Sequence, residues 1–330
     1  MIDDLRKAVD VVRAANRILC ISHINPDIDT LGSSLAMHLA MTKMGKDSTI
    51  LNVSSVPPTM KFLPGVENVV SRIHPRRKFD VTIALDSGNT DRFQGPLMEK
   101  EKLGRLGTII KIDHHKLGED FADIDLTDTQ RASTGELVYE FLKHYPVEMD
   151  LDIATNIYSA IVSDTGFFCY SNSNASAMRD ASEMMQYGVK PWEIASHINE
   201  NKTVNDINIL ADTLGTLKIS ECGRFATLIV TKELKEKHQA ENYMLEGFVN
   251  YPRSINGIEV SAMLREDSED RWKVSLRSKG SIDVAKLSVK MGGGGHANAA
   301  GYQMEGSCKK VAGRLERMVM TRLAKLDKGK

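Results

Sequence analysis

The sequence reads His23-Ile24-Asn25-Pro26-Asp27-Ile28-Asp29 directly after the apolar run Arg17-Ile18-Leu19-Cys20-Ile21-Ser22. That run is typical of a buried strand, and residues 30 to 44 have the pattern of a helix that is closed by Gly45. The histidine and both aspartates therefore fall in the loop between a strand and a helix. Turn chemistry explains one aspartate after a strand, but it needs no histidine partners.

The same residue types recur where other apolar segments end. Asp86 follows a strand pattern at 81–85, Asp113-His114-His115 follows one at 108–112, and Asp164 follows a helical pattern at 152–163. A further strand is expected at 48–53, and further helices at 135–143 and 175–186. This alternation predicts an α/β domain whose mostly parallel sheet is flanked by helices and has a ligand crevice at the carboxyl ends of its strands. We therefore expect these distant residues to converge on one crevice.

Carboxylate and imidazole groups without thiolates are typical of a site for Mn²⁺, Mg²⁺ or Fe²⁺, although ligand type alone leaves Zn²⁺ open. Asp27 and Asp29 are expected to face two ions placed side by side, with Asp86 as the bridging carboxylate. Two ions about 3.5 to 4 Å apart make a hydroxide nucleophilic at neutral pH and stabilise the attacking and leaving oxygens. Phosphoryl transfer gains most from such charge stabilisation. The predicted reaction is hydrolysis of a phosphoester or phosphoanhydride.

The composition is that of a soluble globular protein with two domains. The chain has 330 residues, more than one hydrophobic core usually holds, with 42% hydrophobic and 26% charged residues. A net charge of −1 argues against tracking of long nucleic acids and leaves room for a small anionic substrate. No stretch is apolar enough for a membrane span and the first residues do not resemble a signal peptide, so a cytoplasmic location is expected. The cysteines form neither a zinc knuckle nor a redox pair; they are Cys20, Cys169, Cys222 and Cys308.

The second half of the chain is expected to form a smaller α+β domain. Strand patterns occur at 225–231, 258–264 and 272–276, and a terminal helix is expected at 308–326. A polar connector at 189–210 would separate a catalytic domain at 1–188 from a substrate-binding domain at 211–330.

Four consecutive glycines, Gly292 to Gly295, precede His296 and a run of small residues. Amides without side chains approach an anion closely, and glycine adopts a positive φ at little cost. His296 would add a donor to a phosphate, and Arg277 and Ser278 would extend the phosphate-binding surface. A flexible hinge is the alternative interpretation of the glycines, and an ordinary surface residue is the alternative for Arg277.

Together the motifs resemble the DHH phosphoesterase superfamily, in the branch whose C-terminal, DHH-associated domain carries a GGGGH signature. The resemblance covers nearly the whole chain, with motifs in order at residues 22–33, 86–88, 113–115, 163–166 and 292–301. Length and spacing are most similar to the compact oligoribonucleases of the NrnA type, which also dephosphorylate adenosine 3′,5′-bisphosphate (pAp); the larger RecJ exonucleases carry additional domains. One departure is Ile28, where many relatives have Gly or Ala.

The resemblance implies a manganese-dependent enzyme, with Mg²⁺ as the alternative metal, that cleaves short RNA or DNA oligonucleotides (nanoRNA) to mononucleotides in a cleft between its domains. One ion would be held by His23, Asp27 and Asp86, and the other by Asp29, Asp86, His114 and Asp164. Two residues would serve catalysis: His115 would face the substrate and stabilise the phosphate or assist the leaving group, and Asp113 would support the ligands. The terminal phosphate of the nucleotide would be bound by Arg277, Gly294, Gly295 and His296.

Three alternative functions stay open at this point. Related enzymes cleave linear or cyclic dinucleotides such as pApA or c-di-AMP. An inorganic pyrophosphatase of the same superfamily would share only the N-terminal motifs, so the glycine run disfavours it. A nucleotide-sensing module without turnover is disfavoured because no expected metal ligand is missing. Polarity of digestion, choice between RNA and DNA, native metal and formation of a homodimer are left open by the sequence.

Overall fold

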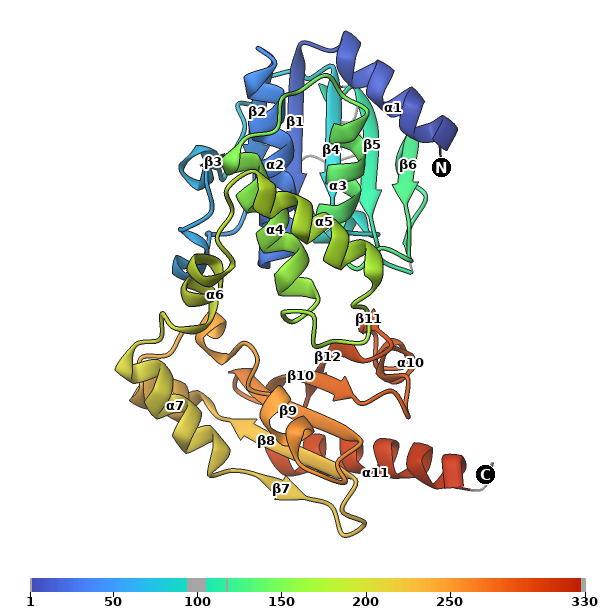
Figure 1. Cartoon of the computed structure of the whole chain (residues 1–330). Coiled ribbons are helices and arrows are strands. Elements are labelled where there is room, and N and C mark those ends of the chain that lie inside the picture. The colour runs from blue at the N-terminus through green and yellow to red at the C-terminus, as the bar shows by residue number, and fades with distance from the viewer. Residues whose placement is uncertain (1, 94–104, 117, 328–330) are drawn as a thin grey trace. The chain divides into compact units, whose positions relative to one another are not determined.

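The computed structural model describes residues 2–93, 105–116 and 118–327, and it contains two compact units, residues 1–201 and 202–330 (Figure 1). Each unit is built on one six-stranded sheet. The boundary falls inside the expected connector, because α6 (Pro191–Asn199) belongs to the first unit and α7 (Val204–Leu214) to the second. A parallel α/β unit followed by a unit with a mixed sheet confirms the expected fold class.

The sheet of the first unit is parallel throughout, in the order β3-β2-β1-β4-β5-β6. Its strands are β1 (Arg17–Ser22), β2 (Asp47–Leu51), β3 (Val69–Val70), β4 (Val81–Leu85), β5 (Thr108–Asp113) and β6 (Ile124–Thr127). From β1 the chain first adds strands on one side, β2 and β3, and then on the other, starting with β4. This reversal is a topological switch point, where the diverging connections leave a crevice at the carboxyl ends of β1 and β4.

The helices of the first unit follow the expected pattern, with differences at their ends. They are α1 (Ile2–Ala14), α2 (Ile28–Lys43), α3 (Thr134–Lys143), α4 (Leu151–Asp164), α5 (Ala175–Gln186) and α6. Helix α2 begins two residues earlier than expected, because the side chain of Asp27 accepts a hydrogen bond from the amide of Thr30 and so caps the first turn. Gly45, at φ 74°, follows the end of this helix as expected.

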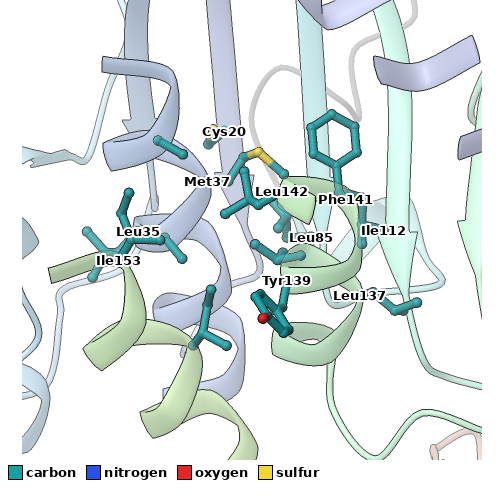
Figure 2. Packing of buried hydrophobic residues seen from close by; sticks show 14 of the residues in the cluster. Cys20, Leu35, Met37, Leu85, Ile112, Leu137, Tyr139, Phe141, Leu142 and Ile153 are labelled. Atoms are coloured by element: carbon teal, nitrogen blue, oxygen red, sulfur yellow. The ribbon is translucent and has the colours of Figure 1, made fainter. Parts of the chain in front are cut away.

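Apolar clusters cover both faces of the parallel sheet. Ile18 and Cys20 of β1 belong to the cluster that includes residues of helices α1 to α5, whereas Leu19 and Ile21 belong to a second cluster. Alternate residues of a strand point to opposite faces, which explains this division. Figure 2 shows side chains of β1, β4 and β5 packed against those of α2, α3 and α4. Each such side chain contributes roughly 1.5 to 3 kcal/mol when buried, so the strands that carry the candidate site are firmly held.

The second unit has a mixed sheet in the order β11-β12-β10-β9-β8-β7, in which only the pair β8 and β9 is parallel. Its strands are β7 (Lys218–Ile219), β8 (Phe225–Val230), β9 (Val260–Ser268), β10 (Arg271–Ser278), β11 (Gly294–His296) and β12 (Ala299–Glu305). Its helices besides α7 are α8 (Lys232–Lys237), α9 (Asn250–Ser254), α10 (Val284–Val289) and α11 (Cys308–Asp327). Trp272, Val274 and Leu276 of β10 pack in one core with residues of α10 and α11. Among the described residues, no helix has the length and apolar character to cross a membrane.

Candidate metal centre

The loop between β1 and α2 places one histidine and two aspartates at the switch point. His23 is buried, and its Nδ1 lies 2.8 Å from the carbonyl oxygen of Ile24. Asp27 caps α2 with one oxygen and is 60% exposed, whereas Asp29, two residues later in the first turn, is buried. The two carboxylates therefore approach the site from different depths.

Asp86 follows β4 in the left-handed conformation, with φ 64°, and is almost completely buried. Aspartate tolerates this conformation better than most residues do. Its Oδ1 accepts a hydrogen bond of 2.9 Å from the hydroxyl of Thr134, and its Oδ2 accepts one from the hydroxyl of Thr30. The backbone turn thus holds both oxygens of the carboxylate in the interior of the site.

Asp113 ends β5, the strand next to β4, and His114 and His115 follow it directly. The Nε2 atom of His114 lies 3.5 Å from Asp86 Oδ1 and 3.7 Å from Asp29 Oδ2. His115 donates through its Nδ1 to Asp113 Oδ1 at 2.7 Å. Burial acts to lower the pKa of His115, but the hydrogen bond with Asp113 and the charge of Asp86 outweigh it and raise that pKa to about 9. Asp113 therefore favours the charged form of this ring.

Two of the sets of clustered donor atoms match the expected metal ligands, and both include Asp86. His23, Asp27 and Asp86 make up one set, and Asp29, Asp86 and His114 make up the other; within each set the atoms lie within 4.8 Å of one another. Asp164, the last residue of α4, borders the second set, with its Oδ2 3.9 Å from His114 Nε2. The structure thus brings together all six side chains that the sequence singled out as metal ligands.

The electrostatics of the cluster suit a divalent cation. Burial and the nearby charges of Asp86 and Asp164 hold the pKa of Asp29 well above its usual value, and burial raises the pKa of Asp164 to about 7. Burial also acts to raise the pKa of Asp86, but its interactions with His23 and the other histidines keep that pKa below its usual value. Asp29 and Asp164 thus lack sufficient compensating positive charge. Oxygen and nitrogen donors without thiolates fit a cation that would supply this charge.

Several residues at the centre did not stand out in the sequence. The amides of Thr134 and Gly135 donate to the two oxygens of Asp29, at 2.8 and 3.0 Å. The guanidinium of Arg92 lies 3.1 Å from both ring nitrogens of His23. A serine, Ser133, placed three residues before a glutamate is a visible signal for a helix start at Thr134. No comparable pattern marks Arg92.

The residues expected to bind substrate lie in the second unit, on β10 and β11, with β12 between these two strands. Ala299 of β12 pairs with His296 of β11 on one side and with Arg277 of β10 on the other. Directly paired residues share a face of the sheet, so the small Ala299 separates two basic side chains in one row. Ser278 is buried, and its hydroxyl accepts a hydrogen bond of 3.0 Å from the amide of Gly280, so it shapes the turn after β10.

The glycine run is part of the sheet rather than a free hinge. Gly292 and Gly295 have positive φ, and a Cβ on Gly293 or Gly295 would lie 2.1 or 2.5 Å from a carbonyl oxygen of β12. A Cβ on Gly294 would meet nothing within 4 Å, and its backbone does not need glycine. Close packing therefore explains Gly293 and Gly295, and the positive φ explains Gly292, whereas Gly294 has neither reason.

Comparisons with known proteins agree with these motifs. Residues 17–161 match the model of the DHH family, N-terminal domain, and residues 224–321 match that of the DHHA1 domain. The bifunctional oligoribonuclease and PAP phosphatase NrnA of Thermus thermophilus is 30% identical to this chain, over 92% of the chain and 89% of the relative. The chain belongs to the DHH family. The resemblance inferred from the sequence motifs is thereby confirmed.

Two further relatives of this DHH-family chain bear on its fold and function. The crystal structure of an exopolyphosphatase-related protein from Bacteroides fragilis matches with a TM-score of 0.90 and 26% identity, over 99% of this chain and 98% of that chain. The cyclic-di-AMP phosphodiesterase PdeA of Listeria monocytogenes is 23% identical over 90% of this chain, which spans 46% of the relative. The first likeness extends over nearly the full length of both chains, and the second is to a larger protein.

Proposed function

We propose that this protein is a metal-dependent phosphoesterase that cleaves short oligonucleotides to mononucleotides and dephosphorylates pAp. The observation that carries the proposal is the pair of donor sets that share Asp86 at the switch point of the parallel sheet. The relative from Thermus thermophilus, named for both activities, matches 92% of this chain, which supports the same substrates. Two neighbouring cations are the arrangement that phosphoryl transfer uses most effectively.

In this proposal the two sets of donors hold two divalent ions, most naturally Mn²⁺, with Mg²⁺ as the alternative. His23, Asp27 and Asp86 would hold one ion, and Asp29, Asp86, His114 and Asp164 the other. When bound, the ions would supply an activated hydroxide and stabilise charge on the phosphate oxygens. His115, oriented by Asp113, would stabilise the phosphate or assist the leaving group.

We further propose that β10 and β11 bind the terminal phosphate of the substrate. Arg277 and His296 stand on either side of Ala299 and offer charged or polar donors in one row. Gly294 would let a phosphate approach its backbone, and Gly295, with its left-handed backbone, would shape this segment. Ser278 would support the end of β10 next to Arg277.

Hydrolysis by the purified protein tests the proposal directly. A five-nucleotide RNA, pAp and inorganic pyrophosphate are incubated separately with Mn²⁺, with EDTA, and with Mn²⁺ restored after EDTA. We expect mononucleotides from the RNA and inorganic phosphate from pAp, lost with EDTA and recovered with Mn²⁺. Hydrolysis of pyrophosphate while RNA and pAp stay intact would contradict the proposal.

A phosphodiesterase acting on dinucleotides is the second candidate, favoured by the likeness to PdeA over 90% of this chain. Both functions use the same metal centre, so they differ in the substrate that is turned over most efficiently. Measurement of kcat/KM for pAp, pApA and c-di-AMP separates them. A value for either dinucleotide that exceeds the values for pAp and the short RNA by tenfold or more would favour the second candidate.

A further inference from the structure

We propose that Arg131 and Glu136 are positioning residues for the metal centre, because they fix the first turn of α3, which in turn holds Asp29 and Asp86. This role deepens the proposed function, since it concerns the same cluster of ligands. Neither residue is a donor in the two ligand sets, and both act through the backbone of residues 132–135.

The first turn of α3 engages both carboxylates that lie deepest in the site. The amide of Thr134 donates to Asp29 Oδ2 at 2.8 Å, and the amide of Gly135 donates to Asp29 Oδ1 at 3.0 Å. The hydroxyl of Thr134 donates to Asp86 Oδ1 at 2.9 Å. Amides at a helix start carry partial positive charge, so they both stabilise and orient a carboxylate. The direction of Asp29 is therefore set by the position of this turn.

Glu136 holds that turn from within the same helix. Its side chain is completely buried, and its Oε2 accepts a hydrogen bond of 2.6 Å from the amide of Ala132. The amide of Glu136 itself donates to the hydroxyl of Ser133, which caps α3. These two bonds clamp the segment from Ala132 to Glu136 at both ends. Thr134 and Gly135, which contact Asp29, lie within the segment that these two hydrogen bonds fix.

Arg131 supplies the positive charge that a buried glutamate requires. Its Nη1 lies 3.5 Å from Glu136 Oε1, and the same nitrogen donates to the hydroxyl of Ser176 on α5 at 2.6 Å. It also lies 3.5 Å from Asp180 of α5, which ties the loop before α3 to a second helix. A buried carboxylate without such a partner costs several kcal/mol. Arg131 and Glu136 thus anchor the loop before α3, and neither residue belongs to the two sets of metal donors.

Substitution of Glu136 by Gln is the decisive perturbation. An amide has one acceptor oxygen where the carboxylate has two, so Gln cannot accept from Ala132 and also attract Arg131. Binding of Mn²⁺ to the purified protein without substrate is measured by titration calorimetry, and thermal unfolding with EDTA reports folding. We expect the variant to fold and to bind Mn²⁺ about 10- to 100-fold more weakly. The Mn²⁺ concentration for half-maximal pAp hydrolysis should rise by the same factor, while kcat at saturating Mn²⁺ recovers.

Glu140→Gln is the matched control. Glu140 lies one turn further along α3, also faces Arg131, at 3.6 Å, and contacts Lys143 at 2.7 Å. The substitution removes the same charge from the same helix, and we expect wild-type affinity for Mn²⁺. Equal losses in both variants would assign the effect to general electrostatics and overturn the positioning role.

Further outcomes separate this inference from the proposed function. If the wild type hydrolyses pAp and Glu136→Gln binds Mn²⁺ like the wild type, the positioning role is wrong and the function stands. If the wild type hydrolyses neither pAp nor RNA, the proposed function fails, while calorimetry still tests Glu136. Should Glu136→Gln not fold, Thr134→Val removes only the hydroxyl that holds Asp86, and Thr134→Ser restores it. Weakened Mn²⁺ binding in Thr134→Val together with wild-type binding in Thr134→Ser supports the role of this turn. Wild-type binding in both variants overturns it.

Discussion

Two adjacent glycines of the run before His296 offer a sharp test of phosphate binding, because the same added methyl group meets different surroundings. At Gly293 a Cβ would lie 2.1 Å from the carbonyl oxygen of Gly301, whereas at Gly294 it would meet nothing within 4 Å. Gly293→Ala is therefore expected to destabilise the second unit. Gly294→Ala is expected to cause no loss of stability and to weaken substrate binding.

The magnitudes follow from these distances. Relief of the clash requires the backbone at Gly293, just before β11, to move away from β12 by about 1 Å or more, and such overpacking costs about 1 to 3 kcal/mol. At Gly294 the methyl group would change stability by less than about 1 kcal/mol, in the stabilising direction, because alanine restricts the unfolded chain. If the backbone there donates to a phosphate, loss of that charge-assisted hydrogen bond costs about 1.5 to 3 kcal/mol. This loss corresponds to a roughly 10- to 150-fold higher KM.

Thermal unfolding and steady-state hydrolysis of pAp measure the two effects separately. We expect a lower melting temperature for Gly293→Ala, and for Gly294→Ala a melting temperature at or slightly above that of the wild type, with a raised KM. A wild-type KM for Gly294→Ala would refute phosphate binding by this backbone. A large loss of stability in Gly294→Ala would instead refute the described geometry of β11.

Three further predictions concern single side chains. Asp86→Asn should lower kcat by several orders of magnitude with little change in thermal stability, because asparagine also tolerates the backbone at φ 64°; wild-type turnover would contradict the bridging role. His296→Ala should raise KM more than it lowers kcat, and a collapsed kcat with an unchanged KM would be the contrary result. Burial raises the pKa of Asp180 to about 6, so the folded state binds this proton more tightly than the unfolded state, and the contribution of Asp180 to stability should fall as pH rises from about 4 to 6. Asp180→Asn removes this contribution, so its melting temperature relative to wild type should increase over that pH range; a constant difference would contradict the raised pKa.

The elements of regular structure around the site were largely predictable from apolar patterns. The strand expected at 81–85 and the helix expected at 175–186 have the same bounds in the structure, as β4 and α5. Strand β11 was not predicted, because glycines have little intrinsic tendency to form strands. Its pairing with β12 through Gly294, Gly295 and His296 stabilises it instead. Helix α1 and the short strand β6 were also not predicted.

The side chains of the metal ligands were predictable from the sequence, whereas the hydrogen-bond network that supports them was not. Aspartate and histidine at the ends of apolar segments are visible in a single sequence, since parallel strands bring such ends together. The contact between Thr134 and Asp29 joins residues 105 positions apart through a backbone amide, which every residue but proline has. Residue type therefore carries no signal for it. Arg131 and Glu136 likewise gain their role from where α3 lies against α2.

The sequence by itself determined which chemical groups are available and which segments carry them, because side-chain type decides the donors and apolar periodicity decides the strands and helices. Only the tertiary structure decided how these groups share the site. The reversal of strand order between β1 and β4 places Asp86 in both donor sets, and the approach of β12 decides which glycines are needed for packing. Both results depend on distances between segments far apart in the chain, which local residue patterns do not encode.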